Sequence, residues 1–591
     1  MAATSRLTDD AVATQAAADQ PSAATNIPLS HIKPDGIRDT IDSIIVALIL
    51  AFVFRAFIVE AFVIPTGSMA PALYGMHGQH RCANCAYSFA FGIREPLPGG
   101  DRGTLFGERG ERRSFPVRCP NCTWDGSGNL LNDDSQPVVP NSGDRILVLK
   151  WPYDIGGAFL GPRRWDVCVF KNPQDGEVNF IKRLLGLPGE VVQIVNGDLY
   201  AAAIRDVPSD IREALTRRIP DRRISTPLNA EQLLKLAEVM KIQRKTPVAQ
   251  ESLWMIHYDH DFIPRKTERD ARSHFFNRPY WEERTDGAPP CWDVSTPRAR
   301  FEPAGVSESR WIDLKGESIQ DEYGYNNIGY SLGGSTPPRF VGDVRVSFVL
   351  FPVGSEGELV LMLSKGEGRF QARLFADGKV SLEKFNTSIR AGFWEEIQRG
   401  QVNRLTPGQS VEVEFENLDY RVALRINKEE VIATTDAQYK PDLQSLFQPA
   451  YEDGRNNEAR VAIAARNLAL EIRHLKVHRD VFYRSDRINE NGPFDGSPGW
   501  GTAMNPVLLR DSPVDFFCCG DNSPQSKDSR LWTEFAPMLL NRKPPNEYQF
   551  GTVPGDQMIG RAFFVYWPSG LRFSKDTMAV IPNVGRMRLI R

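Results

Sequence analysis

The longest apolar run of the chain extends from Ile41 to Ile64 and reads I-D-S-I-I-V-A-L-I-L-A-F-V-F-R-A-F-I-V-E-A-F-V-I. As a helix its 24 residues would reach about 36 Å, enough for a hydrocarbon core of roughly 30 Å. Arg55 must then snorkel or pair, at a cost of about 2.5 kcal/mol or more. The run predicts a transmembrane anchor over residues 41–63, with a buried core helix as the alternative. Lys33 and Arg38 on its N-terminal flank favour a cytoplasmic N-terminus.

The length, the net charge and the composition of the N-terminal residues set only broad limits on the domain organisation and the partners. Residues 1–40 are rich in Ala, Thr, Ser and Asp, which predicts a disordered tail. A chain of 591 residues is too long for one core, so we expect about three or four domains. The formal net charge of −3 gives no sign of a nucleic-acid partner.

Four of the eight cysteines form two C-x-x-C pairs, Cys82 with Cys85 and Cys119 with Cys122. Each short turn presents two thiolates on one side, and two such turns complete a tetrahedral zinc site. We therefore expect a zinc ribbon in an insertion over residues 82–138, with a structural ion that leaves no open position for catalysis. Two disulfides, or one long-range disulfide, are the alternative if the segment faces an oxidising compartment. His77 and His80 are interpreted as surface residues rather than ligands.

Short strands are predicted over residues 139–200, where turns are followed by alternating apolar runs. Lys182 stands in one of them, on the same face as Phe180 and Leu184. It could simply snorkel at a sheet edge. If it is buried, desolvation lowers the pKa of its amine from about 10.4, and a neutral lysine can act as a general base.

A polar loop follows the apolar run near Phe516 and reads G-D-N-S-P-Q-S-K-D-S-R. By itself it could be a calcium-binding Asx loop or a salt-bridged turn. Asp528 and Arg530 are natural partners for a charge-assisted pair that would fix the loop.

Four blocks in this order behind an apolar segment resemble the bacterial type I signal peptidases, or leader peptidases. The blocks are I-P-T-G-S-M-A-P-A-L, G-D-R-I-L-V, F-I-K-R-L-L-G-L-P-G-E and G-D-N-S-P-Q-S-K-D-S-R. The resemblance implies a β-rich catalytic core built from residues 64–81, 139–200 and 483–591. It also implies a membrane-bound serine endopeptidase that needs no cofactor for catalysis.

The resemblance assigns roles to seven residues. Ser68 is the nucleophile and Lys182 the general base, so lysine replaces the histidine of the usual triad. The Thr66 hydroxyl and the Ser68 N–H form the oxyanion hole; the family more often has serine at the position of Thr66. Ser526 hydrogen-bonds the lysine, and the supporting charged residues are Asp521, Asp528 and Arg530.

The substrates implied are exported preproteins with small residues at the first and third positions before the cut. Shallow apolar pockets near the serine would select alanine, and we expect them to be lined by Phe62, Ile64, Leu73 and Ile146. The catalytic part would lie on the outer side of the cell membrane, next to a single anchor that brings the serine close to its substrate.

Residues 201–482 depart from the family pattern. We expect a charged segment with some helix over 201–297, where His257 and His260 are ordinary polar positions rather than metal ligands. The alternating strands over 298–482 predict an inserted jelly-roll β-sandwich, weakly similar to concanavalin-like domains. The insert could contact carbohydrate or protein. The fold class is thus mainly β, and the alternative function is a membrane-tethered binding protein whose peptidase-like core is inactive.

Overall fold

The computed structural model describes residues 36–92, 118–124, 141–155, 157–217, 228–265, 280–285, 287–303, 305, 308–316, 318–326, 338–446, 457–484, 499–532, 534, 536–540, 548–569 and 583–590. The expected disorder of the tail falls mostly outside these residues, as does most of the insertion at 82–138. The chain divides into two compact units, Met1–Arg55 and Ala56–Arg591. The second unit is built mainly of strands, which confirms the predicted fold class.

The apolar run forms the helix α1, Gly36–Phe57. Its part Arg38–Phe57 has a mean hydropathy of 2.1, and it is the one helix among the described residues that is long and apolar enough to cross a membrane. The predicted limit at residue 63 is wrong, because Val59–Val63 is the strand β1. The five residues V-E-A-F-V pair residue by residue with a strand ending at Leu149, and this pairing overrides their helical context.

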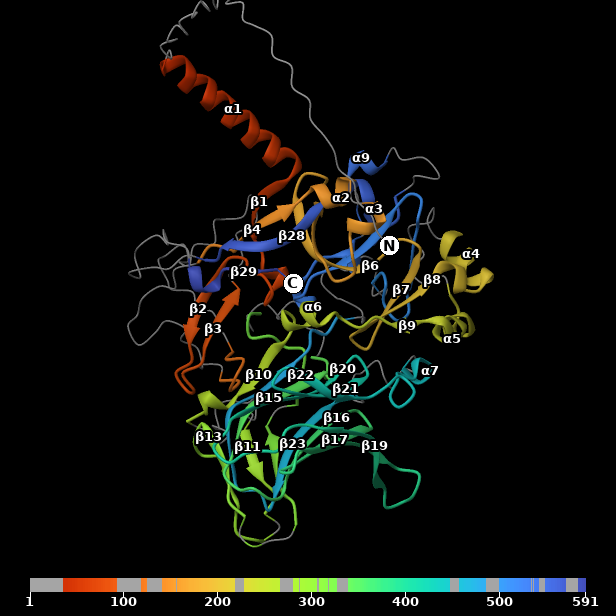
Figure 1. The fold of residues 1–591 in the computed structure, drawn as a ribbon. Helices are drawn as coiled ribbons and strands as arrows, with labels where there is room; N and C mark the ends of the chain where they lie inside the picture. Colours follow the sequence, from red (N-terminus) through yellow and green to blue (C-terminus); the bar gives the residue numbers. More distant parts are fainter. Residues whose placement is uncertain are drawn as a thin grey trace, which may run out of the picture. The chain divides into compact units, whose positions relative to one another are not determined.

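An antiparallel sheet of eight strands, the core sheet, follows the helix (Figure 1). Its segments come from three distant parts of the sequence, as the red, orange and blue ribbons that meet there show. In order across the sheet the strands are β1 (Val59–Val63), β4 (Arg145–Leu149), β28 (Met558–Trp567), β5 (Val167–Lys171), β6 (Asn179–Gly186), β26 (Asp515–Cys519) and β27 (Val553–Pro554), with β29 (Arg588–Leu589) beside β28.

A second, four-stranded sheet consists of β25 (Val507–Leu509), β7 (Glu190–Val195), β8 (Asp198–Ala203) and β9 (Lys241–Ile242). Apolar side chains of α4 (Ser209–Arg217), α5 (Ala230–Val239) and α7 (Leu443–Leu446) form one buried cluster with this sheet. The helices described in the first half of the predicted segment 201–297 therefore pack on this second sheet. The remaining short helices are α2 (Trp151–Ile155), α3 (Gly157–Leu160), α6 (Pro247–Glu251) and α9 (Pro537–Leu540).

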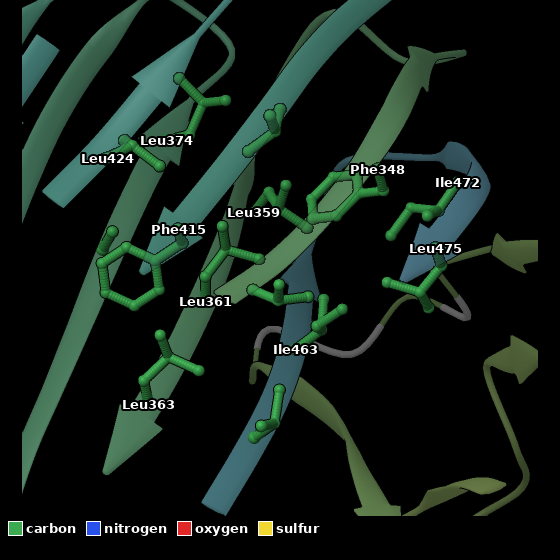
Figure 2. Packing of buried hydrophobic residues seen from close by; sticks show 14 of the residues in the cluster. Phe348, Leu359, Leu361, Leu363, Leu374, Phe415, Leu424, Ile463, Ile472 and Leu475 are labelled. Atoms are coloured by element: carbon green, nitrogen blue, oxygen red, sulfur yellow. The ribbon is translucent and has the colours of Figure 1, made fainter. Parts of the chain in front are cut away.

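The inserted domain is a sandwich of two antiparallel sheets with the core between them, where Phe348, Leu361 and Ile463 meet (Figure 2). One sheet has the order β12 (Trp292–Asp293), β13 (Arg298–Phe301), β24 (Leu470–Arg479), β15 (Val344–Pro352), β20 (Val411–Leu418), β21 (Arg421–Ile426) and β22 (Glu429–Ala433), with β10 (Met255–Asp259) on β24. The other has β11 (Tyr280–Glu283), β14 (Arg310–Lys315), β23 (Ala459–Arg466), β16 (Glu358–Lys365), β17 (Gly368–Phe375), β18 (Lys379–Asn386) and β19 (Phe393–Gln401).

The predicted start of the sandwich at residue 298 is wrong, because its strands begin at Met255. The early strands β10 to β12 are only five, four and two residues long, so their sequence lacks a long alternating run. Their partners lie far along the chain: Met255 pairs with Arg479 and Tyr280 with Lys315.

Buried ion pairs join the sandwich to the second sheet. Lys365 on β16 lies 3.1 Å from Asp198 on β8 and 2.8 Å from Asp343. Asp198, Asp343 and Asp419 form one buried cluster of carboxylates. Lys245 lies 2.9 Å from Asp419 and neutralises part of the negative charge of this cluster. A lysine therefore occupies the place that a cation would otherwise take among these carboxylates.

Candidate active site

Ser68 lies in a short 3-10 turn, Gly67–Met69, directly after the extended residues that follow β1. The turn is fixed to the start of β4, where the Asp144 carbonyl accepts from the Ile64 N–H at 2.9 Å and its carboxylate accepts from the Tyr74 N–H at 3.0 Å. Ser68 itself is 8% exposed. The strand end therefore presents one hydroxyl at a rigid, largely buried position.

Lys182 meets this hydroxyl from the neighbouring part of the sheet. It stands on β6, and its Nζ donates to Ser68 Oγ at 2.6 Å across 114 positions of sequence. No ion pair of Lys182 is found within the described part of the chain. Burial lowers the pKa of its amine to about 8, although the carboxylate of Asp528 acts in the opposite direction. The pair thus combines a hydroxyl with an amine that can be neutral near physiological pH.

Thr66 lies on the exposed side of the same turn. Its Oγ1 is 3.5 Å from Ser68 Oγ, which places the hydroxyl next to the reacting oxygen. The N–H groups at the start of a helical turn have no partner within it, so they can face an anion. The Thr66 hydroxyl therefore lies beside Ser68, whose own N–H is the second donor expected for an oxyanion hole.

The loop after β26 carries the predicted pair of Asp528 and Arg530. Both side chains are fully buried, with Nε to Oδ1 at 2.8 Å and Nη2 to Oδ2 at 2.7 Å. Burial would raise the pKa of Asp528, but the Arg530 guanidinium holds it below its ordinary value. Asp528 also accepts from the Gly520 N–H at 2.9 Å, so the pair fixes the loop as expected.

Asp521 has a partner that the sequence analysis did not single out. Its carboxylate binds Arg183 through Nε at 2.7 Å and Nη2 at 2.8 Å, and both side chains are fully buried. Successive residues of a strand point to opposite faces. The sequence K-R therefore places the Arg183 guanidinium behind the sheet face that carries Lys182, where it requires a buried acid.

Asn522 is a second residue that sequence reasoning missed. Its N–H donates to the Ser68 carbonyl at 3.0 Å, and its Nδ2 donates to the Gly67 carbonyl at 3.0 Å. Its position in the D-N-S sequence is the signal that could have drawn attention to it. The loop thus holds the backbone of the serine turn directly.

The expected hydrogen bond from Ser526 to Lys182 is not formed. Ser526 is 3% exposed, and its Oγ makes no hydrogen bond of ordinary length among the described residues, although it lies near the Asp528 carboxylate. It lies against Gly520 instead, where an added Cβ would be 2.3 Å from Ser526 Oγ and 2.4 Å from the Ser68 carbonyl oxygen. The close approach of these two segments leaves the hydroxyl in the wall behind the serine.

The four expected pocket residues, Phe62, Ile64, Leu73 and Ile146, belong to one apolar cluster together with Met69. Ile64, Leu73 and Ile146 are at most 2% exposed, so in this structure they form a floor rather than an open surface. Only Phe62 is partly exposed. Their role in substrate binding stays a prediction.

The four cysteines of the two C-x-x-C pairs converge beside the hairpin of β2 (His77–Arg81) and β3 (Ser88–Gly92). Their sulfur atoms all lie within 4.8 Å, with Cys82 to Cys122 at 3.6 Å and Cys85 to Cys119 at 3.7 Å. Four sulfurs at about 2.3 Å from one zinc would be about 3.8 Å apart, close to these distances. None of the eight cysteines forms a disulfide in this structure.

The expectation of a surface position for His77 is wrong. His77 is fully buried, its Nδ1 lies 2.8 Å from the Gly75 carbonyl oxygen, and burial lowers its pKa. His260 is also buried, and burial lowers its pKa to about 4. Burial lowers the pKa of His257 to about 3. Among the described residues, none of these histidines belongs to a cluster of metal-ligating side chains.

Comparisons with a family model and with individual proteins find the same family for part of the chain. The family model of signal peptidase, peptidase S26, matches residues 132–261. Signal peptidase I of Buchnera aphidicola is 34% identical over 95 residues, which cover 14% of this chain and 30% of that protein. Signal peptidase I of Pseudomonas fluorescens is 29% identical over 160 residues, which cover 24% and 50%. The chain therefore spans half or less of the length of these relatives.

Among solved structures, the carbohydrate-binding module CBM66 from Bacillus subtilis aligns at 10% identity over 33% of this chain and 94% of that chain. The TM-score is 0.21, too low to carry an argument about this chain.

Proposed function

We propose that this chain, which resembles the type I signal peptidases, is a membrane-bound serine endopeptidase that removes signal peptides from exported preproteins at Ala-x-Ala-like sites. The observation that carries the proposal is the 2.6 Å contact between Lys182 Nζ and Ser68 Oγ. Hydrogen-bond reach between nucleophile and base is the first geometric requirement for covalent catalysis. An inactive binding protein would not require a buried amine to meet this hydroxyl.

In the proposed reaction neutral Lys182 takes the hydroxyl proton while Ser68 Oγ bonds to the scissile carbonyl carbon. The carbonyl oxygen becomes an oxyanion, held by the Thr66 hydroxyl and the Ser68 N–H. The C–N bond then breaks, and the leaving amine receives the proton from Lys182. A water molecule, deprotonated by the same lysine, hydrolyses the resulting ester and releases the signal peptide.

The pH dependence follows from the buried amine. Because only neutral Lys182 accepts a proton, kcat/KM is expected to rise with pH and to level off above its pKa of about 8. Initial cleavage rates of one preprotein, measured from pH 6 to 11 at fixed ionic strength, would test this. A rate that still rises between pH 9.5 and 11 would indicate a lysine with an ordinary pKa.

The α1 helix supplies the proposed anchor, with the N-terminus in the cytoplasm and the catalytic part on the outer side. Ser68 follows Phe57, the last residue of α1, by eleven positions in the sequence. A short connection restricts the serine to the neighbourhood of the bilayer, where the cleavage site of a membrane-inserted signal peptide also lies.

We further propose that the four cysteines hold one structural zinc ion, which takes no part in the peptidase chemistry. Elemental analysis of the purified chain is expected to give about one zinc per chain, and Cys122→Ser should lower this content together with the thermal unfolding temperature. Four freely titrating thiols without bound metal, or two disulfides by mass spectrometry, would contradict the zinc site.

The sandwich is proposed to contact carbohydrate or protein. A cavity of about 730 Å³ lies on the outer side of the β14–β23–β16 sheet, with Trp311 and Trp394 among its lining residues. Both tryptophans are partly exposed, and indole rings provide flat apolar surfaces of the kind such contacts use.

The proposed activity is tested with the full chain in proteoliposomes and a preprotein that carries alanine at positions −1 and −3. We expect one cut after the second alanine, identified from the product N-terminus by mass spectrometry. Ser68→Ala should be inactive, and a bulky residue at −1 of the substrate should prevent cleavage. Equal cleavage by the wild type and by Ser68→Ala would contradict the proposal.

A further inference from the structure

A segment of the inserted region, Glu322–Asn326, lies against the serine turn; we call it the strap. Tyr325 is 2% exposed, and its ring stacks on Tyr74 with the centroids 5.6 Å apart. A Cβ added to Gly67 would lie only 2.2 Å from Tyr325 Cε1. Gly67 has no left-handed φ angle, so the ring and not the backbone conformation excludes a side chain there. The residue before the nucleophile is therefore in direct contact with the insertion.

The next residue of the strap fixes Asn522. The Asn326 Nδ2 donates to Asn522 Oδ1 at 2.8 Å, and the Asn522 Nδ2 donates to Asn326 Oδ1 at 2.7 Å. The Asn522 Nδ2 also donates to the Gly67 carbonyl, and the Asn522 backbone N–H donates to the Ser68 carbonyl. Asn522 is buried and Asn326 half-buried, and side-chain networks whose groups are all satisfied tend to keep a single arrangement. Asn326 thus determines how Asn522 is oriented toward the serine turn.

The strap also contacts the cysteine ribbon. The Tyr325 carbonyl accepts from the N–H of Gly92, the last residue of β3, at 2.8 Å. Gly324 packs on the second C-x-x-C turn, where an added Cβ would lie 2.9 Å from the Arg118 carbonyl oxygen and 3.0 Å from Pro120 Cδ. Arg118 forms an ion pair with Glu322. The strap therefore lies between the four cysteines and the nucleophile.

We infer that Tyr325 and Asn326 are positioning residues for Ser68, and that metal bound by Cys82, Cys85, Cys119 and Cys122 controls peptidase activity through them. The inference rests on the proposed function. The metal would act by fixing the ribbon against the strap, and the strap by holding the serine turn at hydrogen-bond distance from Lys182. A peptidase whose chemistry uses no metal would in this way become dependent on zinc.

The first arm of the test removes the ring contact. A displacement of about 1 Å at a reacting group can cost about a hundredfold in rate. Tyr325→Ala is therefore expected to lower kcat about 10- to 100-fold with KM changed less than about twofold. Tyr325→Phe is the matched control, since it keeps the ring and loses only the hydroxyl, which donates to the Met76 carbonyl at 3.4 Å and interacts with the Gly75 backbone; it should retain nearly full activity.

The second arm removes the metal from the full chain. Zinc-depleted protein is expected to lose kcat to a similar extent and to regain it when zinc alone is added back. Amide hydrogen exchange over residues 64–76 should become faster in zinc-depleted protein and in Tyr325→Ala, without any substrate present. Combining Cys122→Ser with Tyr325→Ala should lower kcat little beyond the larger single effect, because both changes act through one contact chain.

The two proposals fail in different ways. If Tyr325→Ala and the zinc-depleted protein keep both kcat and slow exchange while Ser68→Ala is inactive, the strap inference is wrong and the peptidase proposal holds. If the wild type with zinc cleaves no preprotein, the peptidase proposal is wrong. Faster amide exchange in zinc-depleted protein and in Tyr325→Ala would even then support the structural connection from the cysteines through the strap to the serine turn.

Discussion

The Lys182→Met variant is expected to lose cleavage of a preprotein by about a thousandfold or more while remaining folded. Methionine is unbranched and similar in length, so it fits the apolar surroundings of the amine, but it cannot accept a proton. General-base catalysis typically contributes a factor of about 10² to 10⁴ to the rate, and the variant loses this contribution. It also leaves the Ser68 hydroxyl without the base that activates it, and an unactivated hydroxyl is a weak nucleophile. Single-turnover cleavage in detergent, compared with Ser68→Ala, measures this loss.

The same variant should be more stable than the wild type at neutral pH. Burial lowers the pKa of Lys182 from 10.5 to about 8, so the folded protein binds this proton less tightly than the unfolded chain does. Burying the protonated amine therefore lowers the free energy of unfolding of the wild type by about 3 kcal/mol below pH 8. This destabilisation disappears as the pH rises toward 10.5, where the amine is neutral in both states. Denaturation midpoints at pH 7 and pH 10 should thus favour Lys182→Met at pH 7 only. Substantial cleavage by Lys182→Met would exclude the proposed base.

Removal of the Asp521 carboxylate is expected to have the largest effect on stability. Asp521 and Arg183 are both 0% exposed, and Asp521→Ala would leave a buried guanidinium without its bidentate partner. Loss of one member of a buried pair typically destabilises by about 3–5 kcal/mol. Thermal unfolding of the membrane-reconstituted chain should show a clearly lowered transition, accompanied by loss of activity since Arg183 is adjacent to Lys182.

Two further variants serve as controls. Asp377→Ala removes an exposed ion pair with Lys379, whose side chain is 71% exposed, together with a hydrogen bond from the Lys379 N–H, and should leave the thermal unfolding transition nearly unchanged. The double variant Arg183→Met with Asp521→Leu removes both charges and should recover much of the stability lost by Asp521→Ala. A double variant as unstable as the single one would show that packing, and not the unpaired charge, determines the loss.

The parts of the site that are local in sequence could be predicted. Asp528 and Arg530 are two positions apart, and their pair is formed. The partner of Asp521 could not be predicted in this way, because Arg183 is 338 positions away and no local pattern selects it among many arginines. Ser526 shows the opposite case: its neighbours in sequence match the family, but the approach of Gly520 to the Ser68 backbone leaves its hydroxyl in the wall.

The boundaries of helices and strands were hardest to predict where the local sequence pattern does not change at the boundary or is too short to recognise. The strand β1 lies within a continuous apolar run, so hydropathy alone extends the helix through it; pairing with β4 decides the outcome. Similarly, the first strands of the sandwich are short, and their partners are distant along the chain. In both cases long-range contacts, which a single sequence does not reveal, determine the local structure.

The position of the insertion has a consequence for biosynthesis. The strand β6, which carries Lys182 and Arg183, is completed early, but its neighbour β26 and Asp521 follow only after the sandwich has been synthesised, 338 positions beyond Arg183. At about 5–20 residues per second, this interval lasts roughly 17–70 s. During that time one edge of β6 lacks its partner strand and a buried guanidinium lacks its acid. The support behind Lys182 is therefore complete only after β26 and Asp521 have been synthesised, and until then aggregation through the open strand edge is the hazard that folding must avoid.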